Sequence, residues 1–204
     1  MTRNVQWQQG RVGALQRSKT TGGPGLTLWL TGLPASGKST IAFAAEERLV
    51  GRQRAAYVLD GDNLRHGLTA DLGFSPSDRA ENVRRVGSVA LLLADAGLVA
   101  LVPVVSPYAS DRALVRALHE EMGVPFLEVY VDAPLEVCEE RDPKGLYRKA
   151  RAGTLPGMTG IDDPYEAPQH PDLRLRTADT SVDESVDVLL KAIDSAESEA
   201  LATP

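Results

Sequence analysis

The sequence predicts an α/β fold of three layers, in which a mostly parallel five-stranded sheet carries helices on both faces and a mobile lid. Three observations predict this fold. Short, nearly continuous apolar runs alternate with amphipathic segments of helical period, as in a parallel sheet that is buried on both faces. The first apolar run leads into a glycine-rich turn, and a long stretch rich in Gly and Pro interrupts the alternation from residue 142.

The elements follow an N-terminal arm, residues 1–25, that is polar and Gly-rich from Gln16 and that we expect to lie over the domain or to stay mobile. Residues 26–204 are expected to form one domain. The predicted strands are residues 26–30, 55–59, 98–105, 126–131 and 173–175. The predicted helices are residues 40–50, 79–96, 111–122, 134–141 and 182–196. Ligands of such a sheet bind at the carboxyl ends of its strands.

The turn after the first strand fits the phosphate-binding pattern G-x-x-x-x-G-K-[ST], and its residues are Gly32, Leu33, Pro34, Ala35, Ser36, Gly37, Lys38 and Ser39. A strand that enters a helix through such a turn directs backbone N–H groups and the helix dipole at one point, where polyphosphate binds. Glycines at positions 32 and 37 let the backbone curl without Cβ clashes. Lys38 reaches the β- and γ-phosphates, and the Ser39 hydroxyl ligates Mg²⁺. With Thr40 following, these residues predict a P-loop NTPase fold that binds a nucleoside triphosphate.

Composition excludes several classes of function. The 204 residues carry a net charge of −6, which argues against general nucleic-acid binding. No apolar run reaches membrane-spanning length, and the N-terminus has no apolar signal-peptide core. The single cysteine, Cys138, excludes an internal disulfide, suits a reducing cytosol and is expected to be a core residue. We therefore expect a soluble cytoplasmic enzyme that binds neither nucleic acid nor membranes.

Two further segments suggest what the nucleotide is used for. The stretch from residue 142 to about 171 opens with four cationic side chains and is expected to be a lid that excludes water during phosphoryl transfer. We expect it to lack regular structure and to bury few apolar contacts without ligand; the alternative is a solvated loop. Asp60-Gly61-Asp62 follows the second strand, where one carboxylate can orient Mg²⁺ and the other can accept a hydroxyl proton. An ordinary Asp-Gly turn is the alternative.

Several stretches, in order and spacing, resemble the adenylyl-sulfate kinases between about Asn4 and Thr180: DGDNLRHGLTADLGF (60–74), DRAENVRRVGSVALLLADAG (78–97), SPY (106–108), RDPKGLYRKAR (141–151), TGID (159–162) and PYEAP (164–168). That family transfers the γ-phosphate of MgATP to the 3′-hydroxyl of adenosine 5′-phosphosulfate. The resemblance implies both nucleotides as substrates and Mg²⁺ as the metal. It also implies a homodimer, with a separate ATP sulfurylase as a candidate partner.

The resemblance assigns roles to matching residues. Asp62 matches the carboxylate that aligns and deprotonates the 3′-hydroxyl, while Ser39 and Asp60 match the metal side. Arg141 and Thr177 match positions that flank the ATP base. The positions implied for the acceptor are Arg65, Phe74, Arg79, Asn82, Ser106, Lys144, Met158, Thr159 and Ile161. Phe74 stacks on the adenine, and Lys144 is a lid lysine near the transferring phosphate.

Two features of the match are informative. Ser106 matches a position for which the family has been assigned a phosphoserine intermediate, but direct in-line transfer is expected because a P-loop kinase needs no covalent relay. Met158 stands where the family usually has Phe, so the base would lie between Phe74 and a flexible thioether.

Two other classes of function fit the phosphate loop alone. One is a P-loop kinase of another small molecule, such as a nucleoside, a sugar acid or an antibiotic. The other is a nucleotide-dependent switch or binding module, although no Asn-Lys-x-Asp run that would read guanine is present.

Overall fold

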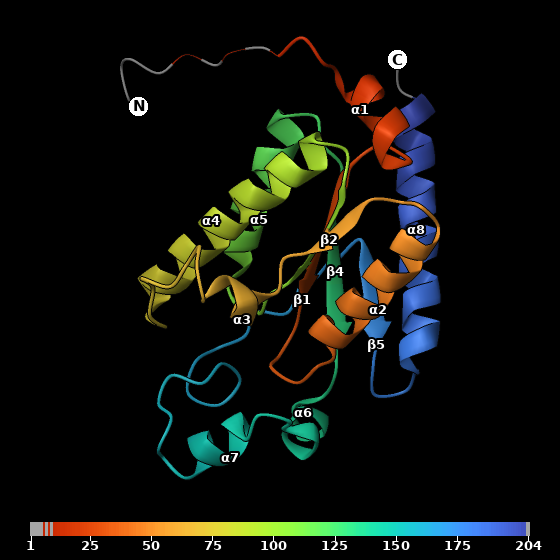
Figure 1. Ribbon diagram of the computed structural model, residues 1–204. Helices are drawn as coiled ribbons and strands as arrows, with labels where there is room; N and C mark the ends of the chain where they lie inside the picture. The colour runs from red at the N-terminus through yellow and green to blue at the C-terminus, as the bar shows by residue number, and fades with distance from the viewer. Residues whose placement is uncertain (1–5, 7, 9, 203–204) are drawn as a thin grey trace.

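The structure, a computed structural model, describes residues 6, 8 and 10–202, so residues 1–5, 7 and 9 of the predicted arm lie outside the described residues. The predicted three-layer α/β fold is confirmed (Figure 1). Its strands are β1 (Leu26–Thr31), β2 (Ala56–Val58), β3 (Val99–Pro103), β4 (Phe126–Asp132) and β5 (Leu173–Arg176). They lie in the order β2-β3-β1-β4-β5, and every neighbouring pair is parallel.

The helices form a layer on each face of the sheet. On one face lie α2 (Lys38–Gly51) and α8 (Val182–Ala202), and on the other lie α4 (Pro76–Asp95) and α5 (Ala109–Glu121) (Figure 1). Among the described residues no helix is both long enough and apolar enough to cross a membrane.

The core consists of two apolar clusters, one on each side of β1. Leu28 and Leu30 pack into the cluster that contains residues of α2 and α8, whereas Trp29 packs with residues of α4 on the opposite face. Successive side chains of a strand point to opposite faces, so the central strand contributes to both clusters. This buried strand leads directly into the phosphate loop, which is therefore anchored at the centre of the sheet.

Three helices were not predicted. One of them, α1 (Ala14–Thr21), lies within the described part of the arm and ends at Gly22, which has a φ of 83°. Arg17 of α1 forms an ion pair with Asp95 at 2.9 Å, and the carbonyl of Thr21 accepts a 3.0 Å hydrogen bond from Arg54. This part of the arm therefore lies over the domain, which is one of the two expected arrangements. The second helix, α3 (Gly61–Leu64), is a single turn after β2.

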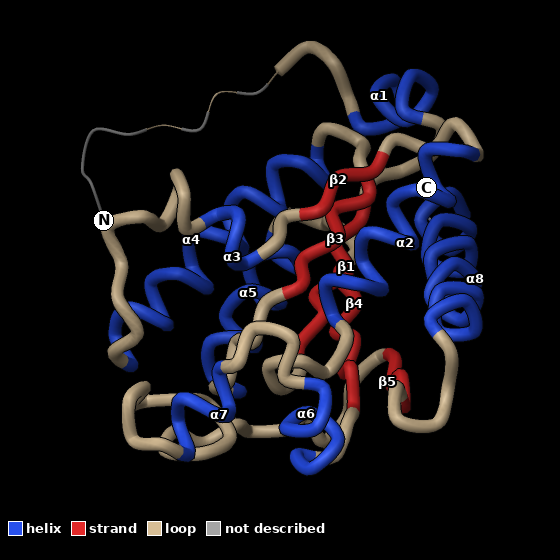
Figure 2. Tube along the Cα trace, turned by 60° about the horizontal axis from the view of Figure 1, so that its bottom comes forward, coloured by secondary structure: helices blue, strands red, loops and turns tan. Residues whose placement is uncertain are grey.

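The third unpredicted helix corrects the description of residues 142–171. The segment was expected to lack regular structure and to bury few apolar contacts, but it contains α7 (Leu146–Arg151) and buries Tyr147, Ala150 and Met158. These side chains pack with the fully buried Cys138 of α6 (Leu135–Arg141), which confirms that Cys138 is a core residue. A helix of six residues is too short to show a clear apolar period in the sequence. Figure 2 shows α6 and α7 together at the end of the molecule where the strands' carboxyl ends lie.

Candidate active site

A cavity of about 940 Å³ lies at the carboxyl ends of the strands. Its walls come from the phosphate loop, from the residues after β2 and β3, from α4, from the predicted lid (residues 142–171) and from the start of α8. Small-molecule sites have volumes of roughly 300–1,000 Å³, so this cavity lies near the upper end of that range.

The phosphate loop adopts the conformation that its glycines predict, for two different reasons. Gly37, at the N-terminus of α2, has a φ of 102°, in the left-handed region that favours glycine. Gly32 is required for space, because a Cβ there would lie 2.4 Å from the carbonyl oxygen of Val131. The loop can therefore lie this close to β4 only because residue 32 is a glycine and has no side chain.

Lys38 lies inside this loop and is 7% exposed. Its ammonium donates hydrogen bonds to the carbonyl oxygens of Gly32, at 3.0 Å, and Leu33, at 2.7 Å. Burial lowers the pKa of Lys38 to about 8, because desolvation disfavours the charged form. An anionic phosphate in the loop would raise this pKa and so favour the charged ammonium.

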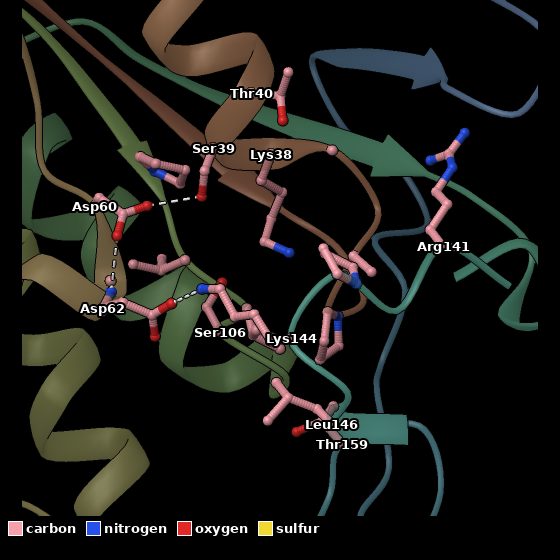
Figure 3. A pocket seen from close by; sticks show the side chains of 18 of the residues that line it. Lys38, Ser39, Thr40, Asp60, Asp62, Ser106, Arg141, Lys144, Leu146 and Thr159 are labelled. Atoms are coloured by element: carbon pink, nitrogen blue, oxygen red, sulfur yellow. Dashed lines mark hydrogen bonds and ion pairs between the residues drawn. The ribbon is translucent and has the colours of Figure 1, made fainter. Parts of the chain in front are cut away.

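Ser39 and Asp60 bring oxygen atoms together beside the loop (Figure 3). The Ser39 hydroxyl donates a 2.7 Å hydrogen bond to one oxygen of Asp60. The other oxygen accepts hydrogen bonds from the backbone N–H groups of Asp62, at 3.0 Å, and Asn63, at 3.2 Å, and so caps α3. A hydroxyl and a carboxylate are hard oxygen donors, and Mg²⁺ is commonly held by one or two protein groups together with nucleotide phosphates. These two residues fit the predicted metal role.

Asp62 and Lys144 meet across the cavity (Figure 3). The ammonium of the lid residue Lys144 forms an ion pair with the Asp62 carboxylate, and both side chains are more than half exposed. The pair joins the end of β2 to the lid, between residues 82 positions apart in the chain. The predicted catalytic carboxylate is thus paired with the predicted lid lysine.

The acceptor-side residues form a second wall. The guanidinium of Arg65 lies 4.1 Å from the centre of the Phe74 ring, which is 62% exposed. Arg79 donates to Gly157, at 2.7 Å, and to Thr159, at 2.9 Å, and so joins α4 to the lid. Asn82 lines the cavity, and its side-chain oxygen is buried without a hydrogen-bond partner among the described residues. Because buried polar atoms normally have a partner, this oxygen is available to accept a hydrogen bond at the cavity wall.

Arg141 and Thr177 lie on the opposite side of the phosphate loop. The Thr177 hydroxyl donates to the carbonyl of Ser36 at 2.7 Å, and Arg141 donates to the same hydroxyl at 3.3 Å. Thr177, the residue after β5, therefore connects the phosphate loop to the end of that strand, and Arg141 is held at the cavity wall.

Most of the predicted site residues line one cavity, and four do not. Gly32, Leu33 and Ser36 form the base of the phosphate loop, while Ile161, predicted to line the acceptor pocket, lies with Leu33 along a separate groove outside the cavity. Ile161 instead packs against the apolar cluster that contains Cys138 and Tyr147. Met158 lines the cavity but is only 6% exposed, within the apolar cluster of the lid.

The cavity is also lined by residues that were not predicted, among them Pro103, Val104, Val105, Pro107, Leu155, Thr180, Ser181, Val182 and Ser185. Most of them follow the carboxyl ends of β3 and β5. The rule that ligands bind at these ends is the signal that could have found those that follow β3 and β5.

Comparison with known proteins identifies related sequences. The family model "Adenylylsulphate kinase" matches residues 24–176. The chain is 52% identical over 187 residues to the adenylyl-sulfate kinase of Marinobacter nauticus, covering 92% of this chain and 93% of that protein. It is 56% identical over 171 residues to the bifunctional enzyme CysN/CysC of Mycobacterium tuberculosis, covering 84% of this chain but only 28% of that protein.

The solved structures agree with the sequence comparison. The structure of the Mycobacterium tuberculosis APS kinase CysC in complex with AMPPNP and APS is similar with a TM-score of 0.82 and 55% identity. The likeness covers 84% of this chain and 99% of that chain.

Proposed function

This chain belongs to the adenylylsulphate kinase family of ATP-dependent kinases, and we propose that it transfers the γ-phosphate of ATP to the 3′-hydroxyl of adenosine 5′-phosphosulfate. The products are 3′-phosphoadenosine 5′-phosphosulfate and ADP. The observation that carries this proposal is that one cavity contains both the phosphate loop and the acceptor-side residues Arg65, Phe74, Arg79 and Asn82.

The donor side holds ATP through the phosphate loop. Backbone N–H groups at the start of α2 and the Lys38 ammonium bind the β- and γ-phosphates, and Arg141 and Thr177 flank the base. Ser39 and Asp60 would hold Mg²⁺, which when bound neutralises charge that develops on the phosphates during transfer.

Asp62 is the general base of this proposal. The acceptor oxygen attacks the γ-phosphorus, the bond to the β–γ bridging oxygen breaks, and the 3′-hydroxyl proton passes to the Asp62 carboxylate. Lys144 pairs with one oxygen of that carboxylate, Oδ2, so the other oxygen can contact the hydroxyl. Since both partners are largely exposed, separating them costs little, and Lys144 is then free to move to the phosphates.

The acceptor is recognised as an anionic adenine nucleotide. The forked donors of Arg65 and Arg79 suit its phosphate and sulfate oxygens, and the exposed face of Phe74 is available for the adenine. The unpartnered oxygen of Asn82 can accept a hydrogen bond from a ribose hydroxyl or an amino group.

The domain, the assembly, the location and the partner of the chain are proposed on the same basis. We propose one kinase domain over residues 26–204, in which residues 142–171 close over both nucleotides, and a homodimer in the cytoplasm. The acceptor must come from an enzyme that joins adenylate to sulfate, so an ATP sulfurylase is the proposed partner.

The test is ADP formation measured with MgATP and a panel of acceptors that contains adenosine 5′-phosphosulfate, adenosine 5′-monophosphate and gluconate. We expect adenosine 5′-phosphosulfate to be strongly preferred. The monophosphate is the matched control because it lacks only the sulfate. Preference for gluconate would replace the proposal with another small-molecule kinase, and tight guanine-nucleotide binding without transfer would indicate a switch module.

A further inference from the structure

Ser106, after β3, accepts hydrogen bonds at both its backbone carbonyl and its side chain. The residue lines the cavity with 4% exposure and has a φ of 40°, in the left-handed region that non-glycine residues rarely adopt. Its carbonyl accepts a 2.7 Å hydrogen bond from Arg112, which is 3% exposed. Arg112 is itself fixed by Glu128, at 2.6 Å, and by the carbonyl of Glu166, at 2.7 Å.

The side chain of Ser106 is fixed separately, by Trp29. The indole Nε1–H of Trp29 lies 3.0 Å from the Ser106 hydroxyl oxygen. Trp29 is fully buried in β1, so neither its position nor its direction can change without disturbing the core. Within the described part of the chain, no other hydrogen bond to this hydroxyl is present.

The chemistry of the two groups decides the direction of this bond. An indole N–H only donates, so the Ser106 oxygen must accept. A hydroxyl oxygen that accepts one hydrogen bond still has its own hydrogen to donate, and the open space beside Ser106 is the cavity. The proton is therefore available to an acceptor on a bound nucleotide.

We propose that Trp29 is a positioning residue that holds the Ser106 hydroxyl as a hydrogen-bond donor to an anionic oxygen of the bound nucleotides. The inference rests on the proposed function for the identity of those nucleotides. The hydrogen bond from Trp29 withdraws electron density from the Ser106 oxygen, which favours donation by this hydroxyl over nucleophilic attack.

The first test is a double-mutant cycle on kcat/KM for adenosine 5′-phosphosulfate. Ser106→Ala should lower kcat/KM by about 2- to 13-fold, the loss of one ordinary hydrogen bond, and Trp29→Phe should lower it by a factor within that range. Trp29→Phe should then cause no further loss in the Ser106→Ala background. Ser88→Ala is the matched control, since that hydroxyl donates a 3.0 Å hydrogen bond to the carbonyl of Arg84 in its own helix. Equal losses from Trp29→Phe in both backgrounds would mean that Trp29 acts through packing, and would overturn the proposal.

The second test does not depend on enzyme activity. It uses Trp29→Phe only to assign a signal, and the measured protein keeps Trp29. The chain has two Trp residues, so two indole N–H signals are expected in a nitrogen-15 NMR spectrum, and the one absent from Trp29→Phe belongs to Trp29. Ser106→Ala should shift this signal because its acceptor is removed, and Ser88→Ala should not. An unshifted signal in Ser106→Ala would refute the hydrogen bond. A wild-type protein without turnover of adenosine 5′-phosphosulfate would refute the proposed function, and the NMR test would still judge the role of Trp29.

Discussion

Asp62→Asn is the substitution that most directly tests the proposed chemistry. The amide keeps the shape of the side chain but cannot accept the 3′-hydroxyl proton. The Asp62 side chain is 64% exposed, and its backbone N–H, not its carboxylate, supports the cap of α3. We therefore expect the variant to fold normally.

The size of the effect follows from the role assigned to the carboxylate. General-base catalysis contributes about 10²- to 10⁴-fold, which corresponds to roughly 3–5 kcal/mol of activation free energy. The exposed ion pair with Lys144 contributes little by comparison, because solvent screens it. kcat should therefore fall by about two to four orders of magnitude, whereas the KM for each nucleotide should change little.

The assay is steady-state ADP formation with both substrates varied, beside two comparison variants. Lys144→Met removes the same ion pair but keeps the carboxylate, so it separates loss of the pair from loss of the base. Asp60→Asn alters the proposed metal side. The reasoning is wrong if Asp62→Asn turns over nearly as fast as the wild type while Asp60→Asn is crippled, because the two carboxylates would then have exchanged roles.

Three further outcomes are expected. Lys38→Ala should abolish transfer in a folded protein, because the activation free energy should rise by about 3 kcal/mol or more. In the wild type, burial lowers the pKa of Lys38 to about 8. ATP affinity measured by calorimetry should therefore decline above that pH, because binding then takes up a proton. Residues 142–171 should gain hydrogen-exchange protection when a non-hydrolysable ATP analogue and adenosine 5′-phosphosulfate are both added. Tyr147→Phe should weaken that protection, because it removes a 3.0 Å hydrogen bond to the carbonyl of Pro34. Equal protection with and without ligands would mean that the segment is a fixed wall of the cavity. Ala35→Gly should raise the free energy of unfolding by about 1 kcal/mol, because Ala35 has a φ of 61°, in the left-handed region that favours glycine. The melting temperature should rise accordingly, and a lower melting temperature would contradict this.

Much of the fold could be predicted because the relevant signals are local. The alternation of apolar runs placed all five strands, and the phosphate-loop pattern located the start of α2 and its ligand edge. The limits of such signals explain the errors. The helix α7 covers only six residues, and α1 lies in a polar segment whose only sequence signal is the glycine that ends it.

The candidate site divides in the same way. The residues of the phosphate loop and Asp60-Gly61-Asp62 are consecutive, so their spacing alone indicated phosphate and carboxylate chemistry. The pairing of Asp62 with Lys144 joins residues 82 apart, and that of Trp29 with Ser106 joins residues 77 apart. No local pattern encodes these pairs, because the packing of β1 against β3 and of the lid against the strand ends brings them together. The sequence by itself determined the fold class, the nucleotide edge and the type of chemistry. Only the tertiary structure decided which polar groups face one another, and that Ile161 lines a separate groove and not the cavity it was predicted to line.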